Sequence, residues 1–203
     1  MVTFQFPLLQ SGGRGEFRFS VSERAVLFAG SRSAELPLQT CSLLISQFAR
    51  LGFGFLVGCA KGVDHSFRHA LACSPYRERC FVACAFPQRV KHVSSWGLDA
   101  GVVVPKNLPP KAALHRRTLW LVKHCSLAVL FPQRPLDGSW GKGSSLVFRA
   151  SMYHLKSVFV VSSTPSPASI HYRLVPSNLF GVVEGFLAVP HPICDGGPCD
   201  EDY

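Results

Sequence analysis

Apolar residues along the chain gather in short blocks that alternate with longer amphipathic segments. Runs rich in β-branched and aromatic residues predict strands, and the segments between them have helical length. In the first half, strands are expected over Arg24–Gly30, Phe53–Gly58 and Arg79–Phe86, with helices over Pro37–Gly52 and Val63–Ala72. Nearly continuous apolar strands between helices predict a parallel sheet that is covered on both faces.

The same alternation returns in the second half of the chain. Further strands are expected over Gly101–Val104, Ser126–Pro132 and Ser157–Ser162, and helices over Pro110–Cys125 and Ser144–Leu155. No break in composition separates the two halves. The predicted fold class is therefore α/β: a Rossmann-like parallel sheet with helices on both faces, in a single domain that covers residues 25–190.

Both ends of the chain are expected to lie outside the main sheet or at its edge. Residues 1–24 predict an N-terminal extension or an edge strand around Glu16–Val21. Leu179–Pro190 predicts a terminal strand or a hairpin, because its apolar residues are interrupted by glycine. Residues 191–203 predict an acidic flexible tail.

Composition adds a core and a charge to this picture. The chain has 203 residues, of which 47% are hydrophobic and 16% charged, so it can bury a sizeable core. Its formal net charge is +9, although four acids stand in the last nine residues: Asp195, Asp200, Glu201 and Asp202. The folded body is therefore more basic than the total. Such a charge favours a polyanionic partner, and the alternative is a positive surface that serves solubility alone.

Eight cysteines and the absence of a recognisable signal peptide bear on the compartment. The N-terminal residues lack the basic and apolar regions of a secretory leader, so we expect a reducing, cytoplasmic setting in which cysteines behave as small buried hydrophobes. No apolar run approaches the roughly 20 residues that cross a bilayer. The cysteine spacings also lack the C-x-x-C pattern of a zinc site, and no metal or cofactor is expected.

The first candidate site follows the first expected strand. Ligands of open parallel sheets bind beyond the carboxyl ends of the strands, where Gly30, Ser31 and Arg32 stand. Glycine lets backbone approach a ligand, serine offers a hydroxyl, and arginine offers a planar donor fork that suits phosphate. The tripeptide thus predicts a phosphate site, and the alternative is a plain turn with a solvated arginine.

The second candidate site is the turn Gly58–Asp64, which has the sequence GCAKGVD and includes Lys61. Gly58 and Gly62 bracket a tight turn before a helix, whose first amides favour an anion. Asp64 is expected either to cap that helix or to accept hydrogen bonds from a sugar or base.

The third candidate site precedes the helix that begins near residue 144. Its residues resemble an amide-rich anion nest: Gly141, Lys142, Gly143, Ser144 and Ser145. Because all three sites follow strands of one sheet, we expect them at the same edge.

Four short motifs follow one another along the chain: AGSRS, then GCAKGVD followed by HAL, then RRT before a strand, then GKGSS at a helix start. Together they resemble the SLOG superfamily, which joins the DNA-processing protein DprA, the LOG proteins and related Rossmann-like nucleotide sensors. The resemblance extends from about Ala25 to Ser162. It departs from the family at Thr118, where asparagine is common, and in the spacing of His69 from Asp64.

The resemblance implies a strand-end pocket that holds a nucleotide or the phosphates of single-stranded nucleic acid. Matched by motif, the implied binding residues are Gly30, Ser31, Arg32, Gly58, Gly62, Asp64, Arg117, Gly143 and Ser144. Members of the superfamily often pair, so a homodimer is a possible assembly.

The LOG branch cleaves a nucleotide N-glycosidic bond and uses a glutamate four residues beyond its last loop glycine. Counted from Gly143, that position is Val147, which cannot exchange a proton or balance an oxocarbenium charge. We therefore expect no catalytic residues and a non-catalytic binding protein of the DprA/SLOG type. The alternatives are a LOG-type nucleotide N-glycosidase, and a nucleotide-messenger sensor or partner-binding protein of a mobile element or defence system.

Overall fold

One eight-stranded sheet runs through the described part of the chain. The computed structural model describes residues 24–132, 140–162 and 169–191. The strands are β1 (Ala25–Gly30), β2 (Gly54–Gly58), β3 (Cys80–Cys84), β4 (Asp99–Val102), β5 (Leu127–Phe131), β6 (Val158–Val160), β7 (Tyr172–Leu179) and β8 (Val183–Pro190). The helices are α1 (Leu38–Arg50), α2 (Val63–Ala72), α3 (Pro87–Ser94), α4 (Pro110–His124) and α5 (Lys142–Tyr153), with a 3-10 turn, η1, at Arg77–Arg79.

The strand order is β4-β3-β2-β1-β5-β6-β8-β7. Strands β1 to β6 pair in parallel, whereas β8 pairs antiparallel with β6 and β7 antiparallel with β8. The chain builds outward from β1 to β4 and then returns to β5 on the other side of β1. The strand order therefore reverses between β1 and β5, which is where open α/β sheets place their ligands.

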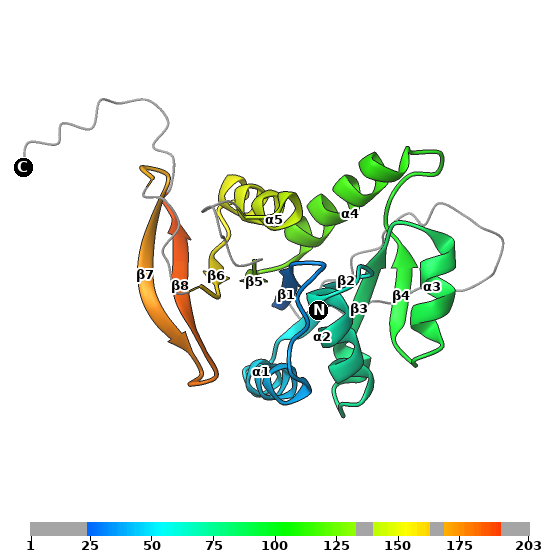
Figure 1. Ribbon diagram of the computed structural model, residues 1–203, viewed down its shortest axis with the longest axis horizontal. Helices are drawn as coiled ribbons and strands as arrows, with labels where there is room; N and C mark the ends of the chain where they lie inside the picture. The colour runs from blue at the N-terminus through cyan, green and yellow to red at the C-terminus, as the bar shows by residue number, and fades with distance from the viewer. Residues whose placement is uncertain (1–23, 133–139, 163–168, 192–203) are drawn as a thin grey trace, which may run out of the picture.

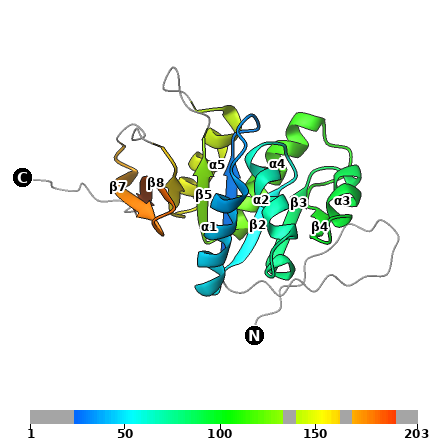
Figure 2. The ribbon, with the colours of Figure 1, turned by 60° about the horizontal axis from the view of Figure 1, so that its bottom comes forward.

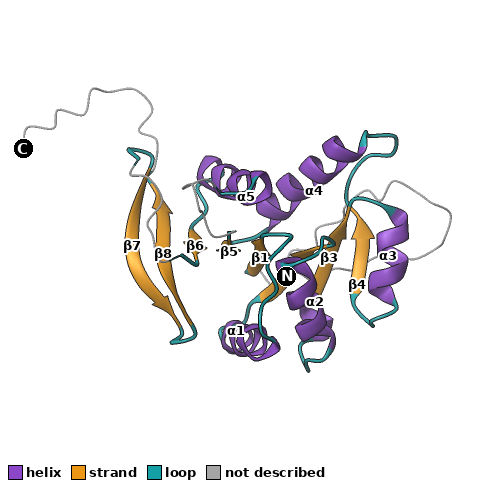
Figure 3. Cartoon of the chain, in the orientation of Figure 1, coloured by secondary structure: helices purple, strands orange, loops and turns teal. Residues whose placement is uncertain are grey.

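Helices cover both faces of this sheet, which confirms the predicted α/β class (Figure 1). Alternate residues of β1 enter two separate cores: Val26 and Phe28 pack with α1, α2 and α3, whereas Leu27 and Ala29 pack with α4 and α5. Phe28 stacks on Phe67 of α2 with 3.9 Å between ring centroids. Figure 3 shows the two helical layers on either side of the strands. None of the described helices is long and apolar enough to cross a membrane.

The predicted segment Leu179–Pro190 forms a terminal strand, β8, and this strand makes a hairpin with β7, which was not predicted. Strands β7 and β8 turn back at Phe180 and Gly181, which both have positive φ values of 58° and 72°. Most of β7 is exposed, and the hairpin continues the sheet beyond the helices (Figure 2). The predictions for residues 1–23 and 192–203 lie outside the described residues.

Candidate functional site

Backbone hydrogen bonds tie three segments together at the carboxyl edge of the sheet. The amide of Ser31, just after β1, donates to the carbonyl oxygen of Phe131 at the end of β5 over 2.9 Å. The amide of Val63, at the start of α2, donates to the carbonyl oxygen of Ser31 over 3.0 Å. The loop after β1 is thus fixed to β5 on one side and to α2 on the other.

Two glycines permit this close approach. A Cβ on Gly30 would overlap the carbonyl oxygen of Phe131. A Cβ on Gly62 would overlap the carbonyl oxygen of Ser31, and Gly62 has φ 67° and ψ −130°, a conformation that glycine alone adopts readily. The predicted glycine turns therefore meet, because neither carries a side chain.

Within the first loop, Ser31 and Arg32 play different roles. Ser31 is buried, and its hydroxyl accepts a hydrogen bond from the amide of Ser33 over 3.1 Å and lies 2.9 Å from the Ser33 hydroxyl. That hydroxyl therefore stabilises the loop. Arg32 is exposed, so its guanidinium is available to solution.

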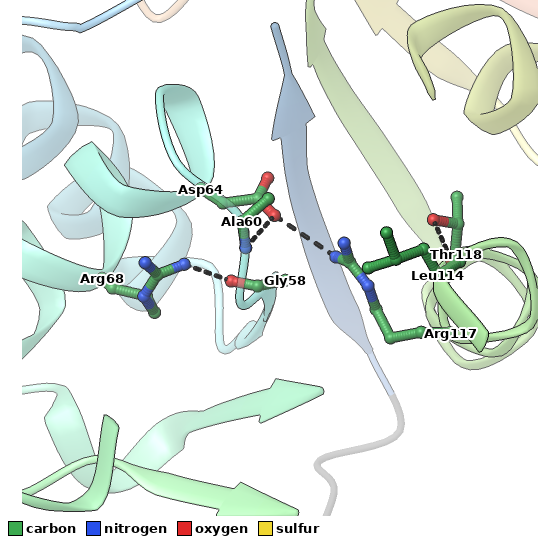
Figure 4. A network of polar contacts seen from close by, with 7 residues as sticks. All are labelled: Gly58, Ala60, Asp64, Arg68, Leu114, Arg117 and Thr118. Carbon is green, nitrogen blue, oxygen red and sulfur yellow. Dashed lines mark hydrogen bonds and ion pairs between the residues drawn. The ribbon is translucent and has the colours of Figure 1, made fainter. Parts of the chain in front are cut away.

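A buried charge cluster lies beneath these loops, where Asp64, Arg68 and Arg117 surround Gly58 (Figure 4). Arg117 Nη1 lies 3.2 Å from Asp64 Oδ2, which also accepts a hydrogen bond from the amide of Ala60 over 3.2 Å. Arg68 Nη1 donates to the carbonyl oxygen of Gly58 over 2.5 Å. The three charged residues are only 6%, 4% and 7% exposed, respectively, so their charges are largely desolvated.

The fold explains why these groups meet. Asp64 and Arg68 are four residues apart on the buried face of α2, whereas Arg117 comes from α4 on the opposite face of the sheet. The ion pair passes over the end of β2 at Gly58, where a Cβ would overlap Arg117 Nη1 and Asp64 Oδ2. The absence of a side chain at Gly58 thus makes room for the pair.

The cluster contains more positive than negative groups. Its two guanidiniums face the single carboxylate of Asp64, and within the described part of the chain Arg68 Nε and Arg117 Nε have no hydrogen-bond partner. Burial lowers the pKa of Arg68, and the nearby Asp64 carboxylate opposes that shift. Buried charge is costly unless it is compensated, so this surplus favours an anion at the carboxyl edge.

The third candidate segment lies at the start of α5. Lys142 and Gly143 are exposed, Ser144 is buried, and the Ser145 hydroxyl donates to the carbonyl oxygen of Trp140 over 3.2 Å. Because α5 follows β5, and β5 neighbours β1, this segment belongs to the same edge as the other two. Among the described residues, no hydrogen bond or ion pair joins Lys142 to the first two loops, so it shares their edge but not their hydrogen-bond network.

Around the positions of Gly141 and Gly143, space is open. No described atom beyond their own neighbours lies within 4 Å of the place that a Cβ would take. Packing therefore does not require glycine at either position.

The contact network thus includes most of the predicted residues: Gly30, Ser31, Arg32, Gly58, Gly62, Asp64 and Arg117. Lys61 is exposed in the turn between them, and residues 141–145 lie at the same edge. The prediction that Asp64 caps α2 is wrong, because Gly62 holds the N-cap position and Asp64 lies in the first turn of the helix. Its carboxylate binds Arg117 and the Ala60 amide, so it is already engaged.

Sequence reasoning missed Arg68. The signal that could have found it is the spacing of Asp64 and Arg68, which places both charges on one stripe of the helix together with Phe67. An acid and a base four residues apart on an apolar face indicate a buried polar pair rather than a solvated one.

The fold has known counterparts among solved structures, although no family model and no curated protein matches the chain. DNA processing protein A from Helicobacter pylori superposes with a TM-score of 0.53 at 18% identity, over 72% of this chain and 69% of that one. The Streptococcus pneumoniae protein DprA gives 0.52 at 18% identity, over 72% and 51%. The chain has a DprA-type fold.

This likeness confirms the resemblance to DprA at the level of the fold. The H. pylori protein is characterised by its mode of binding single-stranded DNA. Against the S. pneumoniae DprA, the present chain matches about half of that protein's length.

Proposed function

We propose that the carboxyl-edge site binds the phosphate groups of single-stranded DNA and catalyses no reaction. The observation that carries the proposal is the buried cluster around Gly58, in which Arg68 and Arg117 outnumber Asp64, next to the turn at Gly62 that packs against the Arg32 loop. The chain's net charge of +9 adds attraction for a polyanion over a longer range.

In this proposal the charged groups have separate tasks. Arg32 contacts a phosphate directly, because its guanidinium is exposed and offers a planar donor fork. Arg117 and Arg68 act on the phosphate through their surplus positive charge. Because both are buried, water screens this charge less than it screens an exposed charge. Lys142, at the start of α5, supplies a second exposed cation at the same edge.

Two observations favour binding over hydrolysis. Val147, which stands where a LOG-type enzyme has its glutamate, is 5% exposed and packs with the core beneath α5. Asp64 is the carboxylate of the buried cluster, and its contacts with Arg117 and the Ala60 amide already engage it. The likeness to the H. pylori protein supports single-stranded DNA rather than a small nucleotide as the ligand.

The test measures the affinity of a short, fluorescein-labelled oligothymidylate by fluorescence anisotropy. Arg32→Ala removes one charge-assisted phosphate contact, so we expect affinity to fall about tenfold, which corresponds to about 1.4 kcal/mol. The slope of log affinity against log salt should decrease by about 1. A matched control is Arg50→Ala, because Arg50 is an exposed arginine in the last turn of α1, at the opposite edge of the sheet.

Equal affinities for Arg32→Ala and Arg50→Ala would refute the proposed site. A nucleoside monophosphate that displaces the oligonucleotide completely, with little dependence on salt, would instead identify a small nucleotide as the ligand. Release of free base from that nucleotide would show that the site is catalytic.

A further inference from the structure

Two buried cysteines lie side by side at the base of the candidate site. Cys59 follows the last residue of β2, and Cys84 ends β3; because Gly58 pairs with Ala83, the next residues on each strand are neighbours. Both side chains belong to the same buried core cluster as Val57 and Val82, which stand two residues earlier on each strand, so they lie on the same face of the sheet. Neighbouring strands lie about 4.8 Å apart, which falls within the Cα separation of roughly 4.4–6.8 Å that a disulfide spans.

The surroundings give the two thiols different acidities. The hydrogen bond from Cys84 lowers the pKa of Cys59; burial opposes this shift, and the positive charge of Arg117 adds to it. The same hydrogen bond raises the pKa of Cys84, and burial raises it further. Cys59 is therefore the more acidic of the two thiols, as is typical of reactive cysteines beside positive charge.

The charges of the neighbouring side chains fit this assignment. Arg68 and Arg117 together carry one positive charge more than Asp64 compensates, and both interact with Cys59. A thiolate at Cys59 would balance this surplus when no external anion is bound.

Other buried cysteines of the described chain lack such a partner. Burial raises the pKa of Cys41 to about 12 and that of Cys125 to about 11. Cys80 begins β3, at the opposite end of that strand from Cys84, and burial raises its pKa as well. These thiols are expected to stay protonated and unreactive.

We propose that Cys59 and Cys84 form a redox-active dithiol, which hydrogen peroxide closes to a disulfide, and that closure strengthens anion binding at the adjacent site. The second half of this proposal rests on the proposed phosphate-binding function. The first half stands on the register of β2 and β3 and on the burial of both cysteines in one core cluster.

The reaction consists of two displacements. The Cys59 thiolate attacks one peroxide oxygen, the O–O bond breaks, hydroxide leaves, and Cys59 becomes a sulfenic acid. The Cys84 sulfur then attacks the Cys59 sulfur as its proton joins the departing hydroxyl group, which leaves as water. The two cysteines lose two electrons in total, and the peroxide accepts them.

Closure changes the charge of the site. A disulfide is neutral, so Arg68 and Arg117 would then be opposed only by Asp64 and by whatever anion the site binds. We therefore expect the oxidised protein to bind a phosphate ligand several-fold more tightly than the reduced protein.

Peptide mapping of the full chain tests the dithiol directly. Trypsin is expected to release Leu51–Lys61, which contains Cys59, and Cys80–Arg89, which contains Cys80 and Cys84. After peroxide treatment and alkylation under denaturing conditions, we expect these peptides to appear linked, with the loss of two hydrogens. The link should persist in Cys80→Ser and disappear in Cys84→Ser. Separate alkylated peptides from the oxidised wild-type protein, or a link that requires Cys80, would overturn the proposal.

Binding of the labelled oligothymidylate by the oxidised and reduced forms tests the coupling. Several-fold tighter binding after oxidation, which is lost in Cys84→Ser, is the expected result. Equal affinities despite a mapped disulfide would overturn the coupling. If the reduced protein binds no oligonucleotide and the oxidised protein binds none either, the proposed function fails, whereas the linked peptide still decides whether the dithiol exists.

Discussion

The turn Gly58–Asp64 and the segment Gly141–Ser145 are both rich in glycine and lie at the same edge of the sheet, yet their glycines face different surroundings. In the first, a Cβ on Gly58 would overlap Arg117, and one on Gly62 would overlap the loop after β1. In the second, a Cβ on Gly141 or Gly143 would meet no described atom within 4 Å.

This difference separates two reasons for a glycine in the candidate site. The glycines of the first turn are required by the protein's own packing. They let the loop after β1, the turn after β2 and the Arg117 side chain of α4 converge. Any requirement for glycine in the second segment must come from outside the fold, for example from a ligand that approaches the backbone. Substitutions should therefore affect stability in the first segment and binding in the second.

The largest expected effect comes from the ion pair that Gly58 accommodates. Asp64→Asn keeps the shape but removes the charge that compensates Arg68 and Arg117, so the free energy of unfolding should fall by about 4 kcal/mol. Urea denaturation measures the change. Glu35→Gln, which neutralises an exposed carboxylate, is the control and should shift stability by less than about 0.5 kcal/mol. A loss below about 1 kcal/mol for Asp64→Asn would show that the pair is not structurally important.

A somewhat smaller loss of stability is expected at Gly62. Alanine there must adopt a positive φ, and its Cβ overlaps backbone atoms of Ser31 and Arg32, so Gly62→Ala should cost about 3 kcal/mol. Thermal or urea unfolding provides the measurement. Wild-type stability in Gly62→Ala would mean that the two loops can separate without cost, contrary to the packing described above.

The smallest effect on stability is expected at Gly143, the second residue of α5. Gly143→Ala should leave the free energy of unfolding unchanged or raise it by up to about 1 kcal/mol, because alanine favours the helix. Oligothymidylate binding should nevertheless weaken several-fold if a phosphate approaches this backbone. Unchanged binding would remove the start of α5 from the site and would restrict the site to the loop after β1 and the turn Gly58–Asp64.

Most of the fold could be predicted from the sequence because its elements have strong local signals. The apolar blocks of β1, β2 and β3 are almost uninterrupted, and the helices between them carry one apolar face. The terminal hairpin was less clear, since β7 is largely exposed and lacks a regular apolar alternation. Its antiparallel pairing depends on the turn at Phe180 and Gly181, whose conformations are not evident from local pattern.

The site could be predicted only in part, because its contacts join residues far apart in the sequence. Arg117 was expected at the site, but its ion pair with Asp64, 53 residues earlier, was not. That contact depends on how α4 crosses the end of β2. Cys59 and Cys84 could not be paired before the register of β2 and β3 was known, so they were interpreted as separate buried hydrophobes.

Hydrogen–deuterium exchange with and without oligothymidylate tests the central claim most directly, because it locates the ligand without any substitution. If the carboxyl edge binds phosphate, amides in residues 30–36 and 141–145 should exchange more slowly in the complex, while the hairpin β7–β8 should not change. Protection confined to the hairpin or to the opposite edge of the sheet, around Arg50, would contradict the account.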